Sequence, residues 1–303
     1  MATNPYILDG KALAATFHGY LRAKSNEVAA KLGRPPGLGV ILVGDNPASR
    51  TYVANKEKTA IACGLHTADH KLAAAARFDE VQEAINDFNA REDIDGILLQ
   101  LPLPGSLDSK KLIPMIRPDK DADGLHPFNQ GLLMSGSGGI KPCTPLGTMY
   151  LLDMAMAGGC ASIEQLPAAD LSGLRAIVVG RSILVGKPVG MLLLERNATV
   201  TYAHSKTPEL PQRCAEADIL VAAVGRAELV RKEWIKPGAI VLDVGINRTA
   251  DGKLVGDVAF AEGCERARAI TPVPGGVGPM TVAMLIRNTV QCCVDRHGLA
   301  IRI

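Results

Sequence analysis

The sequence has few aromatic residues, almost no net charge and no long uninterrupted apolar run. Aromatic residues make up 4% of its 303 residues and hydrophobic residues 47%, so the core has to be built from aliphatic side chains. Lys and Arg total 33 against 31 for Asp and Glu, which leaves no basic excess to attract nucleic acid or an anionic membrane. No apolar run is long enough to cross a bilayer, and no secretory signal opens the chain. We therefore predict a soluble, cytoplasmic protein that binds neither nucleic acid nor membranes.

The cysteines lack the spacings that indicate disulfide bonds or a zinc site. The seven are Cys63, Cys143, Cys160, Cys214, Cys264, Cys292 and Cys293. Their number is odd, no C-x-x-C pair occurs, and no two of the six histidines stand at ligand spacing on a predicted helix. We therefore expect small buried thiols in a reducing compartment, and no metal.

Short apolar runs alternate with helical patterns along most of the chain. The predicted strands are 38–43, 65–72, 95–101, 176–179, 198–203, 218–224 and 239–244. The predicted helices are 9–32, 46–64, 79–91 and 280–297, with a further helix start at Thr144-Pro145. This alternation predicts an α/β fold with parallel sheets and helices on both faces.

A loop-rich segment from Pro118 to Cys143 separates two such halves. We expect the final helix to return to the first half. The predicted domains are therefore residues 1–143 with 277–303, and residues 144–276 as a Rossmann-like domain. Ligands of open α/β sheets bind beyond the carboxyl ends of the strands, which predicts an active site in the cleft between the domains.

The stretch AIVVGRSILVGKPVG at 176–190 predicts a strand, a glycine turn and a helix. That order brings backbone N–H groups and a helix N-terminus to a phosphate. It is not a Walker loop, because Pro188 follows Lys187 where a hydroxyl is needed. It is not G-x-G-x-x-G either, because Ser182 and Val185 replace two of the glycines. An ordinary turn without a ligand remains the alternative.

The end of the strand at 198–203 distinguishes between the two nicotinamide dinucleotides. An NAD site places an acid there, whereas this strand ends in His204, Ser205 and Lys206. Arg181 adds a second cation from the glycine turn, so the pattern favours the extra phosphate of NADP. The alternative is an ordinary solvated loop.

Candidates for chemistry lie in the first half. Ser49, Tyr52 and Lys56 share one face of a predicted helix, and Gln100 stands at the end of a buried strand. A lysine on a helix is usually a solvated cation, but one that is buried and hydrogen-bonded can act as a base. Gln100 either orients such a neighbour or only ends its strand.

The segment DKDADG at 119–124 mimics the start of a calcium loop. Gln130 replaces the bidentate glutamate, and Pro118 and Pro127 are incompatible with the flanking helices, so we reject calcium. The alternatives are a solvated acidic turn, or Asp123 pairing with N–H groups of a substrate.

Five stretches together are specific to one family. They are SRTYVANKEK around Lys56, DGILLQLPLP around Gln100, PDKDADGLHP around Asp123, VVGRSILVGKP at the glycine turn and PGGVGPMT near the end. The chain resembles, over nearly its whole length, the bifunctional methylenetetrahydrofolate dehydrogenase / methenyltetrahydrofolate cyclohydrolase family. Ala122 and Leu125 depart from the common valine and phenylalanine, at positions without a catalytic role.

The resemblance implies that NADP⁺ accepts hydride from 5,10-methylenetetrahydrofolate and that water opens the methenyl product to 10-formyltetrahydrofolate. It implies that Lys56 is the general base for hydrolysis and that Tyr52 stacks near the pterin. Gln100 would orient Lys56 and lower its proton affinity, and Asp123 would anchor the pterin.

The resemblance also implies two binding sets and a homodimer paired through the dinucleotide-binding domains. The substrate set is Tyr52, Gln100, Pro102, Asp123, Gly275 and Gly276. The cofactor set is Gly180, Arg181, Ser182, Ser205 and Ile246. Two alternatives stay open at this point, namely another two-domain NADP dehydrogenase of the shikimate type and a non-catalytic NADP-binding sensor.

Overall fold

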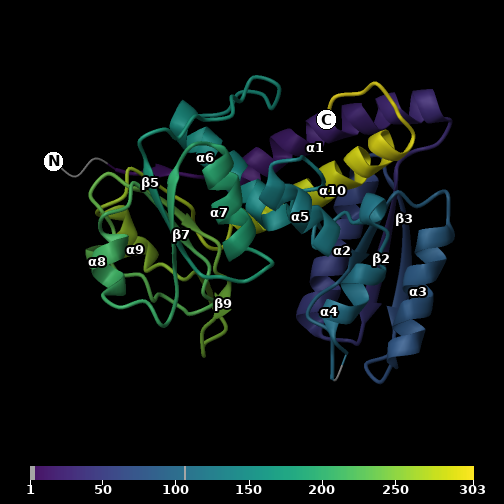
Figure 1. Cartoon of the computed structure of the whole chain (residues 1–303), viewed down its shortest axis with the longest axis horizontal. Helices are drawn as coiled ribbons and strands as arrows, with labels where there is room; N and C mark the ends of the chain where they lie inside the picture. The colour runs from purple at the N-terminus through teal and green to yellow at the C-terminus, as the bar shows by residue number, and fades with distance from the viewer. Residues whose placement is uncertain (1–3, 106) are drawn as a thin grey trace. The chain divides into compact units, whose positions relative to one another are not determined.

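The computed structural model describes residues 4–105 and 107–303, which form two compact units (Figure 1). The three-stranded unit contains Phe17–Cys143 and Val282–Ile303, and the six-stranded unit contains Thr144–Thr281 together with the chain up to Thr16. Both units combine helices with a parallel sheet, which confirms the predicted α/β class.

The sheet of the three-stranded unit has the order β3-β2-β4. Its strands are β2 (Gly37–Val43), β3 (His66–Leu72) and β4 (Gly96–Leu99), and β2 is parallel to both neighbours. Every residue of β2 and β4 is buried, as expected of strands covered on both faces. The helices are α1 (Gly10–Leu32), α2 (Pro47–Ala62), α3 (Phe78–Ala90), α4 (Ser109–Leu112), α5 (Pro127–Ser135) and the C-terminal part of α10 (Val277–Arg296).

The sheet of the six-stranded unit has the order β1-β11-β8-β7-β5-β6, and all its pairs are parallel. Its strands are β1 (Tyr6–Ile7), β5 (Arg175–Val179), β6 (Thr199–Ala203), β7 (Ile219–Ala222), β8 (Ile240–Asp243) and β11 (Ala269–Ile270). A hairpin of β9 (Asn247–Arg248) and β10 (Leu254–Val255) follows β8. The helices are α6 (Cys143–Ala157), α7 (Gly186–Glu195), α8 (Leu210–Cys214) and α9 (Phe260–Cys264).

The structure differs from the predicted organisation in two places. The segment 118–143, which the sequence predicts to be rich in loops, also contains α5, which starts at Pro127. The units place the chain up to Thr16 with the six-stranded sheet, because Tyr6 in β1 pairs with Ala269 in β11. The predicted first domain contains the chain up to Thr16 and residues 277–281, which the structure groups with the six-stranded unit. The predicted domains and the structural units share one boundary, between residues 143 and 144.

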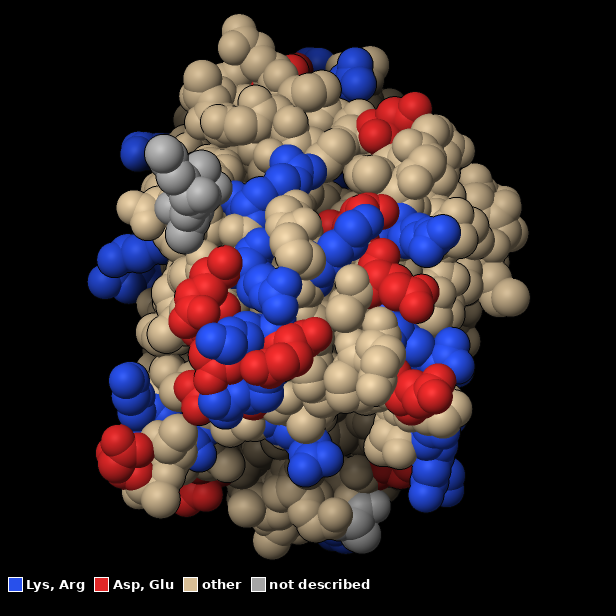
Figure 2. All heavy atoms as spheres, turned by 90° about the vertical axis from the view of Figure 1, so that its left-hand side faces the viewer, with Lys and Arg blue, Asp and Glu red and all other residues tan. Residues whose placement is uncertain are grey.

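Charged side chains of both signs are interspersed on the face shown in Figure 2. Neither blue nor red side chains gather there into one large patch, as the near balance of 33 basic and 31 acidic residues leads one to expect. Over residues 4–105 and 107–303, the helices are too short or too polar to span a bilayer.

Candidate active site

Lys56 and Gln100 form a direct contact in the three-stranded unit. Lys56 lies on α2 and is only 8% exposed, and its Nζ donates a hydrogen bond to Gln100 Oε1 at 2.8 Å. The Gln100 Nε2 donates to the carbonyl of Leu101 at 2.5 Å, which directs the amide oxygen toward the lysine. The Lys56 side chain is therefore buried and oriented, and it does not extend into solvent.

Cys143 lies close enough to Asp123 and Lys56 for both charges to act on its thiol. The thiol donates a hydrogen bond to the carbonyl of Ala122 at 3.3 Å, and the Cys143 backbone N–H donates to the carbonyl of Asp123 at 3.3 Å. Complete burial raises the pKa of Cys143 well above its usual range, the Asp123 charge raises it further, and Lys56 opposes the shift. Cys143 thus stays a neutral thiol. The sequence suggested no role for it beyond that of a buried thiol.

The other charged residues of the segment 119–124 are Asp119, Lys120 and Asp121, and each is paired or hydrogen-bonded within the protein. The expectation of a solvated acidic turn is therefore wrong. Asp119 pairs with Arg117 at 2.7 Å. Lys120 is fully buried, and its Nζ donates to three backbone carbonyls around the end of α3. Asp121 is buried and accepts from N–H groups at the start of α5. Burial raises the pKa of Asp121.

Tyr52 and Pro102 provide exposed surface next to this buried pair. Tyr52 lies one helical turn before Lys56 and is 43% exposed, whereas Ser49 on the same face is buried. Pro102 is exposed two residues after Gln100. An aromatic ring that keeps this much free surface is available to stack on a planar ligand.

The six-stranded unit forms the predicted glycine turn between β5 and α7. At Gly180, with φ +136°, an added Cβ would lie 2.2 Å from the carbonyl oxygen of Ala223. At Gly186 it would lie 2.4 Å from the Gly180 oxygen. The turn is thus tight enough to require both glycines. Ser182 Oγ accepts from the N–H of Val185 at 3.1 Å and so fixes the turn from within.

Two cations mark the edge of this turn. Arg181 is exposed and has no hydrogen bond or ion pair among residues 4–105 and 107–303. Ser205 and Lys206 are exposed at the end of β6, where no acid stands. A free guanidinium with a nearby hydroxyl and ammonium fits a phosphate monoester on a ribose.

Of the remaining candidates, Ile246 is exposed, whereas Gly275 and Gly276 are packed against another part of the chain. Ile246 follows β8 and is 48% exposed, so its side chain is accessible to a ligand. Gly275 and Gly276 lie against the start of α1, because Lys11 N donates to the Gly275 carbonyl at 3.0 Å. A Cβ on Gly10 would lie 1.8 Å from the Gly276 oxygen. These two glycines therefore have a packing role, whatever ligand they border.

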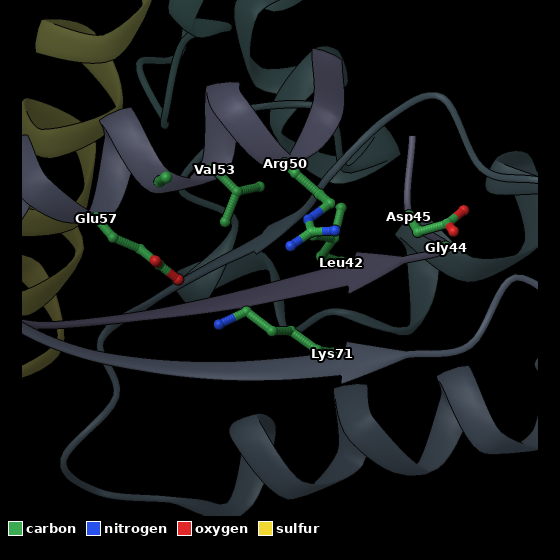
Figure 3. A pocket seen from close by; sticks show the side chains of 8 residues that line it. Leu42, Gly44, Asp45, Arg50, Val53, Glu57 and Lys71 are labelled. Atoms are coloured by element: carbon green, nitrogen blue, oxygen red, sulfur yellow. The ribbon is translucent and has the colours of Figure 1, made fainter. Parts of the chain in front are cut away.

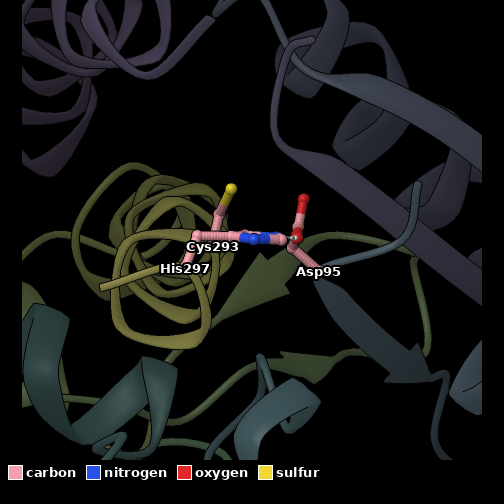
Figure 4. Close-up of side chains that lie close together, drawn as sticks. All are labelled: Asp95, Cys293 and His297. Atoms are coloured by element: carbon pink, nitrogen blue, oxygen red, sulfur yellow. Dashed lines mark ion pairs between the residues drawn. The ribbon is translucent and has the colours of Figure 1, made fainter. Parts of the chain in front are cut away.

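Asp95, Cys293 and His297 converge in the way that metal ligands do (Figure 4). Asp95 is nevertheless already paired with Arg34 at 2.7 Å and with Arg296 at 2.9 Å. Burial raises the pKa of Cys293 to about 12, so the thiol remains protonated. A metal ion here would have to displace two guanidinium groups. We conclude that this cluster is an ion-pair network.

A hollow of about 390 Å³ lies over β2 and β3. Figure 3 shows Arg50, Val53 and Glu57 projecting into it from α2 and Lys71 from β3. Burial raises the pKa of Glu57, and Lys71 pairs with Asp69. The hollow shares no residue with the predicted active site, and its charges of opposite sign identify no ligand.

The fold and site define an α/β protein with a dinucleotide-binding turn and a buried lysine–amide pair. Residues 8–123 match the catalytic domain of the tetrahydrofolate dehydrogenase/cyclohydrolase family, and residues 142–297 match the NAD(P)-binding domain of that family. The chain belongs to this family.

Relatives and solved structures agree with this assignment. The Bifunctional protein FolD of Sphingopyxis alaskensis is 52% identical over 300 residues, which are 97% of this chain and 95% of the relative. A bifunctional FolD structure from Campylobacter jejuni has a TM-score of 0.89 at 43% identity, covering 96% of this chain and 99% of its own. A FolD structure from Trypanosoma brucei, complexed with NADP and an inhibitor, has a TM-score of 0.87 at 36% identity, covering 98% and 100%.

These matches confirm three predictions. The first is the family, the second is the pair of activities, methylenetetrahydrofolate dehydrogenase and methenyltetrahydrofolate cyclohydrolase, and the third is the NADP cofactor. They favour this function over a shikimate-type dehydrogenase and over a non-catalytic sensor.

Proposed function

We propose that this enzyme carries out both steps with the lysine–amide site of its three-stranded unit. It oxidises 5,10-methylenetetrahydrofolate with NADP⁺ and hydrolyses the methenyl cation to 10-formyltetrahydrofolate. The observation that carries this assignment is the 2.8 Å bond between buried Lys56 and Gln100. An absorbance assay with methylenetetrahydrofolate and NADP⁺ tests the function, and failure of the purified protein to form the methenyl product would contradict it.

The oxidation step needs positioning more than acid or base. Hydride leaves a carbon flanked by two nitrogens, and their lone pairs stabilise the resulting cation. When bound, NADP⁺ supplies the hydride acceptor. We propose that Tyr52 stacks on the folate rings, that Pro102 borders them, and that Asp123 accepts hydrogen bonds from the N–H groups of the pterin. Gly275 and Gly276 are proposed to border the folate as well.

The hydrolysis step needs a base beside a cation. We propose that the Lys56 amine takes a proton from the attacking water as its oxygen bonds to the methenyl carbon and the π pair of the cation returns to nitrogen. The bond between that carbon and N5 then breaks, and N5 receives the proton, which leaves the formyl group on N10. Gln100 presents an oxygen to the lysine, so it orients the amine but does not favour its uncharged form. The cationic substrate does so instead, because a like charge nearby disfavours ammonium.

Five residues of the six-stranded unit are proposed to hold NADP. Gly180 and Ser182 shape the turn, Arg181 and Ser205 bind the 2′-phosphate, and Ile246 packs against the nucleotide.

We further propose that residues 144–276 act as the NADP-binding domain and that residues 1–143 with 277–303 act as the catalytic domain. The enzyme is proposed to work in the cytoplasm.

The Arg181→Ala variant is expected to raise the KM for NADP⁺ about 10- to 100-fold, since one charge-assisted pair contributes about 1.5–3 kcal/mol. The KM for NAD⁺, which lacks the phosphate, should change less than about threefold. Steady-state oxidation rates with each cofactor measure both values. Arg213→Ala, which removes another exposed guanidinium of the same unit, serves as the control. Equal losses with both cofactors would contradict a phosphate contact.

The protein is proposed to form a homodimer through its six-stranded unit. Strand β6 is the edge of that sheet, and its outer hydrogen-bonding groups are free to pair with a second copy. Leu194 on α7, a helix that packs against β6, is 56% exposed and so offers an apolar side chain to a second copy. Sedimentation equilibrium should give twice the chain mass of 31.9 kDa, and Leu194→Lys should weaken the association. A monomer at all micromolar concentrations would refute the proposal.

A further inference from the structure

Asp257 is a fully buried carboxylate that fixes two loops of the six-stranded unit. It accepts from the backbone N–H groups of Val224 at 2.6 Å, Gly225 at 2.9 Å and Arg226 at 2.9 Å. The Asn247 side-chain amide donates to it at 2.9 Å. All four donors are uncharged. The segment 224–226 follows β7, and Asn247 opens β9 directly after the loop that follows β8.

Asp243 in turn fixes the backbone of Asp257. At the end of β8, its carboxylate accepts from the N–H groups of Gly245, Asp257 and Val258, each at 2.9 Å. A Cβ on Gly245 would lie 2.3 Å from the Asp257 carboxylate, and a Cβ on Gly256 would lie 1.8 Å from that of Asp243. Both glycines are therefore required for the two carboxylates to lie this close to the backbone.

The loops fixed in this way lie where a dinucleotide binds. They follow the carboxyl ends of β7 and β8, and β7 is paired with β5, which leads into the glycine turn. The loop after β7 also contacts that turn directly, because Gly180 packs against the backbone of Ala223. Ile246, in the other loop, leaves nearly half of its surface free beside Asn247.

We infer that Asp257 is a positioning residue for NADP, holding the loops after β7 and β8 in the shape that accepts the cofactor. The inference rests on the proposed cofactor site. It assigns no contact between Asp257 and NADP, because the carboxylate is buried and its oxygens face the loop N–H groups. Asp257 acts through the loop backbone.

The Asp257→Asn variant tests this role while keeping the size of the side chain. Its NH₂ group must face N–H donors, so hydrogen bonds are replaced by repulsion. We expect the KM for NADP⁺ to rise about 10-fold or more and kcat for oxidation to fall, because the loops lose their fixed shape. Hydrolysis of methenyltetrahydrofolate without cofactor should stay within about twofold of the parent.

Asp218→Asn is a matched control at the opposite end of the same sheet. Asp218 precedes β7 and accepts from Arg175 N at 2.9 Å and from Lys236 Nζ at 2.5 Å, so its replacement by Asn also removes one accepted hydrogen bond. This variant is expected to lose thermal stability without any change in the KM for NADP⁺. Should Asp257→Asn fail to fold, Asn247→Ala removes only one donor and should raise the KM about threefold.

Three results would overturn the inference. They are an unchanged KM for NADP⁺ in a folded Asp257 variant, an equal loss of cofactor-free hydrolysis, and the same rise in KM for Asp218→Asn. These results differ from failure of the proposed function, in which the parent protein itself would show no NADP-dependent oxidation.

Discussion

The Lys56→Met variant is expected to hydrolyse methenyltetrahydrofolate about a thousandfold more slowly than the parent, because a general base contributes about 10²- to 10⁴-fold to a rate. Methionine fills the same buried volume beside Gln100 but cannot accept a proton. The variant should fold and bind NADP with unchanged affinity, since no nucleotide contact is assigned to α2. Loss of the methenyl absorbance measures hydrolysis, and cofactor fluorescence titration measures binding.

A matched control lies on the same helix. Lys58 is exposed on α2, so Lys58→Met removes an amine of the same kind without touching Gln100. That variant should keep the parental rate. Oxidation by Lys56→Met should fall much less than hydrolysis, because positioning dominates the first step. Hydrolysis by Lys56→Met at the parental rate would mean that another group, or unassisted water, removes the proton.

The lysine site shows which features sequence reasoning could recover. Spacing along one helix placed Tyr52 and Lys56 on one face, and an amide at the end of a buried strand suggested an orienting partner for the lysine. The structure brings Lys56 and Gln100, 44 positions apart, into hydrogen-bond contact. The role of Cys143 could not be found in this way, because only the tertiary fold places its thiol beside both Asp123 and Lys56.

The glycine turn shows a second limit. In sequence, Val185 stood where the third glycine of the common dinucleotide motif allows a helix to approach a strand. In the structure that approach occurs at Gly190, where a Cβ would lie 2.2 Å from the Tyr202 hydroxyl. Tyr202 also donates to the carbonyl of Lys187 at 2.8 Å. A fixed spacing of glycines does not reveal the need for Gly190, because Tyr202, the residue that occupies the space beside it, lies on β6.

Two further features could not be predicted from the sequence: the very short strands, and the contact of Lys120 with carbonyl groups at the end of α3. Strands β1 and β11 have two residues each, too few for any periodicity to appear. Lys120 lies between two acids in sequence, yet its ammonium contacts carbonyls about thirty positions earlier, at Phe88 and Arg91. Charge patterning predicts solvent exposure for such a residue, and only packing reveals the buried partners.

The Lys120→Met variant is expected to lower the free energy of unfolding by about 3 kcal/mol, because it leaves buried carbonyls at the end of α3 without a donor. The Nζ donates to the carbonyls of Phe88 and Asn89 at 3.0 Å and of Arg91 at 2.7 Å. Denaturant unfolding followed by circular dichroism measures the loss. The exposed Lys110 provides the control, and Lys110→Met should change the stability by less than about 0.5 kcal/mol.

The same lysine should also make stability depend on pH above neutrality. Burial, aided by the charges of Arg296 and Arg117, lowers the pKa of Lys120 to about 8 from an ordinary value of 10.5. Between these two values the folded protein has released the proton and the unfolded chain still holds it, so the lysine's contribution to stability increases with pH. The difference in unfolding free energy between the parent and Lys120→Met should therefore widen from pH 8 to pH 10. A constant difference would mean that the three carbonyls hold the ammonium in its charged form throughout.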